Sequence, residues 1–588
     1  MAKADKKDTS KAIETAPEPP KDDSSLVVKE DVTTLAPAAA ATAKQKFNFK
    51  AFLKTKKGKI VAVLVAVILI IGVVFAVPAS RYAVAGLVVK KDVMVELTDS
   101  ETGKPVSAAD VTLGRQTYKT NAHGKATFTS IAAGNWHVST KKSYYQDGAT
   151  DVLVPILSNP GTVKISVVAT GRQVPVTVTN KITGEAIANA EILANDAAAT
   201  TAENGEATLV LPADKQTVSA MFKVSGYNDL TADITITEQI DDKNKFALTP
   251  VGTVYFLTKR TGKVDVMSSN LDGSNQKVVL AGTGKETDNN AYPELIPSAD
   301  WKHLVLKARR DNDVKLYSIS TTDNKLTTID EGAGIDFTTI GWAGDSFVYQ
   351  VFRPTVKMWE AKRFSLKAYS DATKKITTLD DTEGTGTGPG AWLSQIYAFT
   401  RIVDGRVVFV KYWEDQNMTG ELNTKKDPFV TVKPDGSDKK TVKEFTSPWT
   451  KTFELRANKP DSFYLRVIYH VNPTEYFEYL DGQLTTTTAV DANTFYSNVL
   501  YYKVSPSGKH TAWQEFRDKW VVLVGDEKGA NGTVVFSENG YQPLGWFTDD
   551  YLLLVKDGTL YVYPTKPQTG AALQKVTEFL SVNYIDLY

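Results

Sequence analysis

Cysteine is missing from the 588-residue sequence, and histidine is scarce. Without cysteine the chain has no disulfides, no thiolate metal sites and no cysteine nucleophile. The five histidines are His123, His137, His303, His470 and His510. Their spacing matches no metal-ligand pattern. The sequence therefore predicts no metal and no cofactor, and a chain of this kind outside the cell would depend on large hydrophobic cores.

The chain also lacks a charge of one sign, because 68 basic residues balance 68 acidic ones. The balance is uneven, since residues 1–59 hold 13 lysines and 8 acidic residues, which leaves 55 basic and 60 acidic residues for the remainder. A slightly acidic remainder offers no basic footprint for nucleic acid. We therefore expect no nucleic-acid partner.

Long apolar runs are absent except for one, the 18 residues from Ile60 to Val77. At 1.5 Å per residue the run spans about 27 Å, close to the thickness of a bilayer's hydrocarbon core. No charged residue occurs between Lys59 and Arg81. The sequence therefore predicts a single transmembrane helix at 60–80, with the lipid bilayer as its partner.

Lysines before this run predict its orientation. Residues 44–59 form a basic juxtamembrane segment, whereas residues 1–43 contain few large apolar side chains and are expected to be a disordered cytoplasmic tail. The positive side of a span stays in the cytoplasm, so the bulk of the chain is expected outside a cell membrane. The lysines expected to contact lipid headgroups are Lys50, Lys54, Lys56, Lys57 and Lys59.

A signal peptide cleaved after Ala79 is the alternative to an anchor, because Val77-Pro78-Ala79 offers small residues at that point. The leader and the apolar core would both be longer than those of ordinary signal peptides, which favours an uncleaved anchor.

Two copies of one pattern follow the apolar run. The segments 95–113 and 176–194 align at an offset of 81, and "HGKATF" at 123–128 aligns with "NGEATL" at 204–209. Each copy alternates apolar and polar residues between Gly, Asn and Asp turns, which predicts β-sandwich modules at 88–170 and 171–250. The pattern resembles carboxypeptidase-regulatory-like and PEGA-type modules. That resemblance implies spacer or adhesive units.

The remaining segment, 252–588, contains short strand patterns without a helix. "IGWAGDSFVY" at 340–349 recurs as "LGWFTDDYLL" at 544–553, and "SADWKH" at 298–303 recurs as "SPSGKH" at 505–510. Spacings of 204 and 207 residues are each four units of about 51, the size of a propeller blade. The fold class expected is mainly β, ending in a seven-bladed propeller, with six to eight blades compatible with the pattern. The blades are expected to start near residues 254, 292, 338, 396, 453, 498 and 541.

The first blade reads as three strands only, and "VNYIDLY" at 582–588 is expected to complete it. The phrases "SADWKHLVLKARRDNDVKLYSI" and "VMSSNLDGSNQK" resemble the repeats of TolB-type and dipeptidyl-peptidase-type propellers. The hydrolase domain that follows the propeller in dipeptidyl peptidases has no counterpart here, so the resemblance implies no catalytic residues.

Several short motifs suggest chemistry but have simpler interpretations. Gly344-Asp345-Ser346 matches the nucleophile block of GDS-type esterases, yet the same turn at 549–550 has no serine. "AGTGKET" at 281–287 lacks the first Gly and the final Ser or Thr of a phosphate loop. The adjacent carboxylates Asp380 and Asp381 are expected in a solvated turn. No catalytic residue is predicted, and the chain is not expected to be an enzyme.

Three long excursions, at 352–363, 380–395 and 411–427, are expected on one face of the ring. Aromatic and arginine side chains on loops suit contact with protein or carbohydrate, although they also pack loops onto a scaffold. The candidate binding residues are Phe352, Arg353, Trp359, Trp392, Tyr412 and Trp413. The sequence favours a bacterial cell-surface binding or scaffold protein that contacts an envelope protein or glycan. The alternatives are an extracellular hydrolase with a site in the propeller channel and a membrane-tethered sensor.

Overall fold

The structure, a computed structural model, describes residues 55–236, 244–286, 293–389, 391–415, 421–446, 451–456, 459–469, 473–488 and 499–580. The chain divides into two compact units, residues 1–81 and 82–588.

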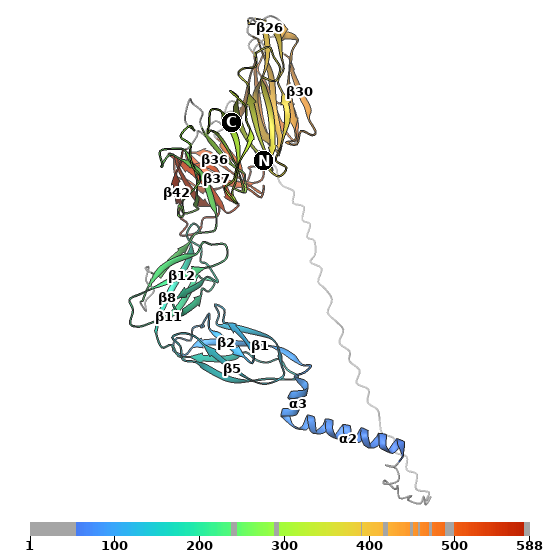
Figure 1. Ribbon diagram of the computed structural model, residues 1–588, viewed down its shortest axis with the longest axis vertical. Helices are drawn as coiled ribbons and strands as arrows, with labels where there is room; N and C mark the ends of the chain where they lie inside the picture. The colour runs from blue at the N-terminus through green and yellow to red at the C-terminus, as the bar shows by residue number, and fades with distance from the viewer. Residues whose placement is uncertain are drawn as a thin grey trace, which may run out of the picture. The chain divides into compact units, whose positions relative to one another are not determined.

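The first unit contains helix α2 (Lys56–Ala76), and α3 (Pro78–Ala85) follows it (Figure 1). The side chain of Thr55 caps α2, because its Oγ1 accepts a hydrogen bond of 2.9 Å from the Gly58 backbone N–H. Lys56, Lys57 and Lys59 are exposed, whereas Lys50 and Lys54 lie outside the described residues. Within the part of the chain that the structure describes, no helix combines the length and hydropathy that a membrane crossing requires.

Module 1, residues 88–170, pairs a three-stranded sheet (β4-β1-β7) with a four-stranded sheet (β3-β2-β5-β6). In the first sheet β1 is central and runs antiparallel to β4 and parallel to β7. Alternate residues of β1 are buried, as a strand with one face on a core requires. The strands are β1 (Lys90–Asp99), β2 (Asp110–Leu113), β3 (Gln116–Lys119), β4 (Lys125–Ala132), β5 (Gly134–Lys141), β6 (Gly148–Val154) and β7 (Val163–Val167).

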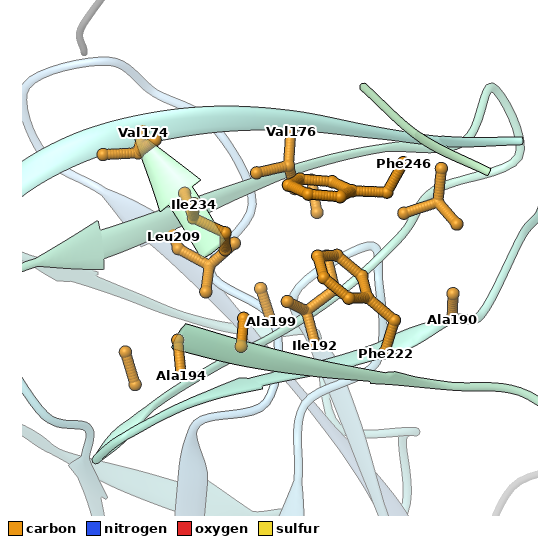
Figure 2. Close-up of a cluster of buried hydrophobic side chains, with 14 of the residues drawn as sticks. Val174, Val176, Ala190, Ile192, Ala194, Ala199, Leu209, Phe222, Ile234 and Phe246 are labelled. Atoms are coloured by element: carbon orange, nitrogen blue, oxygen red, sulfur yellow. The ribbon is translucent and has the colours of Figure 1, made fainter. Parts of the chain in front are cut away.

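Module 2, residues 171–250, repeats this topology strand for strand, with sheets β11-β8-β14 and β10-β9-β12-β13. Its core lies between the two sheets, where Val174 and Val176 of one sheet face Ile192 and Phe222 of the other (Figure 2). The strands are β8 (Arg172–Asn180), β9 (Glu191–Ala194), β10 (Ala197–Thr200), β11 (Glu206–Leu211), β12 (Thr217–Lys223), β13 (Leu230–Thr235) and β14 (Lys245–Leu248).

From Thr253 onwards the described strands form seven consecutive antiparallel sheets, the blades of a β-propeller. Blades one to three comprise β15 (Thr253–Thr258), β16 (Asp265–Asn270), β17 (Lys277–Leu280); β18 (Glu294–Pro297), β19 (His303–Arg309), β20 (Val314–Ser320), β21 (Leu326–Asp330); and β22 (Asp336–Ala343), β23 (Ser346–Phe352), β24 (Phe364–Ser370), β25 (Lys375–Asp381). Blade four has five strands, β26 (Gly384–Gly388), β27 (Ala391–Val403), β28 (Arg406–Asp415), β29 (Lys426–Val432) and β30 (Lys440–Thr446). Blades five to seven comprise β31 (Lys451–Arg456), β32 (Ser462–Tyr469), β33 (Glu475–Leu480), β34 (Gln483–Thr486); β35 (Val499–Val504), β36 (His510–Arg517), β37 (Lys519–Asp526), β38 (Thr533–Phe536); and β39 (Gln542–Thr548), β40 (Tyr551–Lys556), β41 (Thr559–Pro564), β42 (Gln574–Glu578).

Hydrophobic clusters of the described residues join most neighbouring blades of the ring. One buried cluster joins blades three and four, another joins four and five, and a third joins six and seven. The ends of the ring meet where Val254 and Leu271 of blade one pack with Leu553 and Val562 of blade seven. This cluster closes the ring across about 300 residues of sequence.

The observed architecture agrees with the expected mainly β class, and each first strand begins close to its predicted blade start except in blade four. There the extra strand β26 begins at Gly384. The expected closing strand at 582–588 lies outside the described residues. The described chain ends beside β15, since the backbone N–H of Leu580 donates to the carbonyl of Leu257 at 2.8 Å.

Candidate functional site

Blade four carries a hairpin that is longer than the ring requires. β27 and β28 pair from Leu393↔Asp415 to Val403↔Arg406, whereas β28 pairs with β29 only over Val407–Val410. Residues 391–397 and 411–415 therefore continue the hairpin past the four-stranded part of the blade, and β26 pairs with their outer end (Figure 1). We call these two stretches together with β26 the hairpin extension. The expected loop 380–395 is thus largely strand, because pairing with a distant partner orders a glycine-rich segment that reads locally as loop. Of the expected loop 411–427, residues 411–415 and 426–427 are strand, residues 421–424 form a 3-10 helix, and residues 416–420 lie outside the described residues.

The loop at 353–363 packs against the start of this extension. A Cβ added to Gly384 would lie 2.6 Å from the carbonyl oxygen of Glu360 and 2.7 Å from the carbonyl carbon of Trp359. The backbone N–H of Lys362 also donates to the carbonyl of Thr382 at 2.7 Å. Two of the three expected excursions are therefore in direct contact, and only glycine at 384 allows this approach.

Phe352 and Arg353 support this loop from its base. The Phe352 ring stacks on Phe364 with centroids 4.8 Å apart, and the Arg363 guanidinium lies 5.1 Å from the Phe352 ring. Arg353 donates to the carbonyl of Lys362 at 2.9 Å and to Ser365 Oγ at 2.8 Å. Both side chains keep partial exposure while they hold the loop in place.

The four remaining candidates differ in burial. Trp359, Trp392 and Tyr412 are half-buried. Trp413 is only 8% exposed, and the Lys425 ammonium lies 4.7 Å from its ring. Of these four candidates, Trp359, Trp392 and Tyr412 therefore keep accessible surface. Their role in binding stays a prediction.

Tyr412 also links the extension to blade five. Its ring lies 6.2 Å from that of Phe453, and its hydroxyl donates to Glu414 at 3.2 Å. Burial and the neighbouring Glu414 carboxylate raise the pKa of Tyr412 to about 12. The side chain is therefore neutral at physiological pH, and its one hydroxyl proton is donated to Glu414.

A buried ionic network holds the base of the extension. Asp380 lies within 3.1 Å of Lys411 Nζ and 2.6 Å of Lys439 Nζ, and it accepts a hydrogen bond of 3.0 Å from the Tyr397 hydroxyl. Asp380 is 7% exposed, so the expectation of a solvated turn is wrong for this residue. Burial and this carboxylate raise the pKa of Tyr397. The network fixes the direction in which the extension leaves the ring.

The esterase-like triplet has a structural role. Ser346 begins β23 and has no hydrogen bond to a histidine in the part of the chain that the structure describes. His303 pairs with Asp371 of blade three at 2.8 Å, while Asp300 accepts from Ser298 Oγ at 2.7 Å within its own turn. Asp300 and His303 thus take part in two separate interactions.

The glycine-rich segment at 281–286 already holds a carboxylate. Glu286 accepts hydrogen bonds from the backbone N–H of Thr283 at 2.7 Å and of Gly284 at 2.9 Å, and Arg310 lies 3.3 Å away. These donors are occupied by the chain's own side chain, which agrees with the interpretation as an inter-blade loop.

Sequence reasoning missed three basic residues at one end of the propeller's first strands. Arg401, Arg456 and Lys503 lie close to the final residues of β27, β31 and β35. The signal that could have found them is a basic residue near the end of the first strand in three consecutive blades.

No family model matches the chain, and no curated protein matches it. Solved structures do resemble it. The oligogalacturonate lyase of Vibrio parahaemolyticus is 10% identical, with 54% of this chain and 87% of that chain covered at a TM-score of 0.31. The propeller domain of the Trilobed protease from Pyrococcus furiosus is 8% identical, with 63% and 96% covered at a TM-score of 0.29. TolB from Acinetobacter baumannii is 11% identical, with 54% and 77% covered at a TM-score of 0.24. The chain is thus similar to β-propeller proteins that include enzymes as well as TolB.

Proposed function

We propose that the protein is a non-catalytic binding protein of the bacterial cell envelope, which contacts a protein or glycan through the hairpin extension of blade four and the loop at 353–363. The observation that carries this proposal is the length of β27 and β28, which have 13 and 10 residues. The strands of the other blades have four to eight residues. Ring closure does not require the additional length.

The extension combines exposed aromatic surface with rigid support. Trp359, Trp392 and Tyr412 keep partial exposure, while the ionic network around Asp380 holds the strands beneath them. Recognition surfaces are enriched in tryptophan and tyrosine, and a site on paired strands loses little conformational entropy on binding. These properties suit a partner-binding surface.

A membrane anchor at 60–80 is the second part of the proposal, and it rests on the sequence. Fourteen of the 18 residues from Ile60 to Val77 are Ile, Leu, Val or Phe, and a lysine-rich segment precedes them. Ile60, Leu64 and Ile68 are at least 54% exposed along α2, so no described protein surface covers them. The side chains of Ile71, Val73, Val74 and Phe75, which complete the run, lie outside the described residues. In this arrangement the N-terminus is cytoplasmic, and the two modules form a stalk of the PEGA or carboxypeptidase-regulatory-like kind.

The binding surface is tested by affinity capture from envelope extract with the full chain in detergent. We expect the chain to retain a protein or glycan, and the double variant Trp359→Ala/Trp392→Ala to lose most of it. The matched control is Phe516→Ala, because Phe516 is an aromatic residue of blade six with 45% exposure. Equal retention by the wild type and the double variant would contradict the proposal.

The anchor is tested by fractionation of cells that produce the chain with and without residues 56–81. We expect the wild type in the membrane fraction after a carbonate wash and the deletion variant in the soluble fraction. A wild-type chain released by the wash would contradict the membrane anchor. The binding surface is tested only by the capture experiment, so one part of the proposal can be wrong while the other holds.

A further inference from the structure

Three cationic side chains gather near the axis of the propeller. Arg401, Arg456 and Lys503 belong to the first strands of blades four, five and six. First strands of neighbouring blades approach one another, as β27 does with β31 and β35 with β39, so they line the centre of the ring. The three residues lie within two positions of the ends of strands that run in the same direction. The topology therefore places them at one level, at one end of the channel.

Their charges act on each other. Burial and the nearby Arg456 lower the pKa of Arg401 to about 10. Burial and the nearby Arg401 lower the pKa of Lys503. Each of the three residues is partly buried.

The guanidinium of Arg401 has unused donors. Its Nε and Nη2 atoms are buried and have no hydrogen-bond partner among the described residues. These two atoms form one edge of the guanidinium fork, the edge that binds a carboxylate or phosphate through two parallel hydrogen bonds. The ammonium of Lys503 likewise has no ion pair with a carboxylate in the part of the chain that the structure describes.

Such an arrangement is unfavourable without an anion. A buried charge that lacks a counter-ion costs several kcal/mol, and like charges in a low-dielectric channel add to this cost. Buried polar groups in folded proteins almost always have partners, so two unsatisfied guanidinium donors beside further cations point to a ligand.

We propose that this end of the propeller channel is a binding site for a dianionic oxyanion, such as a phosphate monoester or a dicarboxylate, held by the Nε and Nη2 atoms of Arg401 with Arg456 and Lys503 beside it. Two negative charges balance the charges of Arg401 and Lys503, and the fork geometry requires two oxygens on one centre. The site is distinct from the hairpin extension, because Arg401 lies near the hairpin turn at residues 404–405 and the extension lies at the opposite end of the same strands. The inference therefore does not rest on the proposed function.

The test is isothermal titration of the full chain in detergent with inorganic phosphate, pyrophosphate and malonate at constant ionic strength, with chloride as reference. We expect saturable binding of at least one of these probes and none of chloride. The phosphate and malonate arms distinguish a phosphoryl from a carboxylate ligand. Arg401→Gln is expected to weaken binding at least about tenfold, because it removes the fork and one charge. The matched control is Lys277→Gln, an exposed lysine on the outer strand of blade one.

A second readout separates ligand binding from a structural role. Because Arg401 lacks a counter-ion in the free chain, Arg401→Gln is expected to raise the melting temperature without anion and to abolish the increase that the anion produces. Arg401→Lys keeps the charge but not the fork and is expected to bind with intermediate affinity. The inference is overturned if the wild type binds none of the probes. It is equally overturned if Arg401→Gln binds as tightly as the wild type.

Discussion

Modules 1 and 2 have the same strands in the same order, yet only the first turn of module 2 packs into the hydrophobic core of the propeller. In module 1 the turn after β1 is capped by Asp99, whose Oδ1 accepts from the backbone N–H groups of Glu101 and Thr102 at 3.0 and 2.8 Å. In module 2 the turn after β8 is capped in the same way by Asn180, at 2.8 and 3.1 Å. The backbone of the turn is conserved between the copies, so the difference lies in what its side chains contact.

The turn of module 2 enters the propeller core. Ile182 is fully buried in the cluster that joins blades one and seven, and Asn180 Nδ2 donates to the Tyr551 hydroxyl at 3.0 Å. Lys181 pairs with Asp272 of blade one at 2.8 Å. At the position of Ile182, module 1 has the exposed Glu101. The turn of module 1 contacts Gln173 of module 2, which donates to Asp99 Oδ2 at 3.3 Å. Outside this turn, Tyr144 of module 1 packs against the module 2 core, and the backbone N–H of Thr200 donates to Ser107 Oγ at 3.0 Å.

The same turn therefore makes a different kind of contact in each module. One apolar residue in the turn gives a shared hydrophobic core, whereas a charged residue leaves a polar contact.

Replacement of Ile182 by aspartate should separate module 2 from the propeller. A charge in a fully buried site without a partner destabilises by at least about 3 kcal/mol. Calorimetry of the full chain should show separate unfolding transitions for module 2 and the propeller, with the propeller melting at a lower temperature than in the wild type. Ile182→Ala tests the same contact more mildly, at about 2–4 kcal/mol. The control is Glu101→Asp in module 1, and an unchanged thermogram for Ile182→Asp would contradict the shared core.

Thr120 and Thr201 should be equivalent, because each fills the same buried position of its module. Thr120 donates to the carbonyl of Val106 at 2.7 Å and accepts from the Ala109 N–H at 3.0 Å, and Thr201 does the same with Ile187 and Ala190 at 2.6 and 2.8 Å. Valine leaves both backbone groups unsatisfied, at about 1–3 kcal/mol in each module. Urea denaturation measures this, with the exposed Thr127→Val as control. A large effect in one module alone would break the equivalence.

The stability of module 1 should depend on pH through Lys142, whereas module 2 has Val224 at the equivalent position. Burial and the neighbouring Lys119 lower the pKa of Lys142 from 10.5 to about 8. Between these values the unfolded chain holds more protons than the folded one, so stability rises with pH through that window. The cost of the buried ammonium is fully present below pH 8.

In the variant Lys142→Val this rise should be absent. The stability of the variant relative to the wild type should therefore be greater at pH 7.5 than at pH 10.5, by about 1–2 kcal/mol after solvent screening is allowed for. Denaturation midpoints at the two pH values measure it. The exposed Lys141→Val is the control, and a difference that does not change with pH would contradict the lowered pKa.

The smallest effect is expected for Gln173→Ala, which removes the polar contact with Asp99 at a cost below about 0.5 kcal/mol. Its counterpart Lys181→Met should cost more, about 1 kcal/mol, because Asp272 is 8% exposed at its side chain. Burial alone would raise the pKa of Asp272, but hydrogen bonds from Lys181, Ser274 and Thr249 hold it well below its usual range. Equal losses from both variants, measured by urea denaturation, would remove the distinction between the two junctions.

Much of the architecture is predictable from the sequence because it is periodic. Strand alternation and recurrent turn phrases locate the repeats, as the match between Gly341-Trp342 and Gly545-Trp546 shows. Pairing over longer distances is not visible in this way. β26 reads as a glycine-rich loop, and its strand conformation depends on β27.

The candidate site is predictable only in part, for the same reason. Aromatic residues in long excursions directed attention to blades three and four. Burial distinguishes Trp413 from Trp392, and burial depends on chain segments distant in sequence, such as Asp427, whose carboxylate accepts a hydrogen bond from the Trp413 backbone N–H at 3.1 Å. The buried Ile182 is unremarkable in sequence, since a threonine-glycine turn with an isoleucine before it gives no sign of its partner.

The insertion of Ile182 at the junction of blades one and seven also has a mechanical consequence. A tensile force applied through module 2 reaches the ring at its seam, where it is divided between the first and the last blade. If module 2 were attached to blade one alone, the same force would peel that blade from its neighbour. Because the seam residues contact the turn from both sides, tension transmitted through module 2 must shear a shared core before the ring can open.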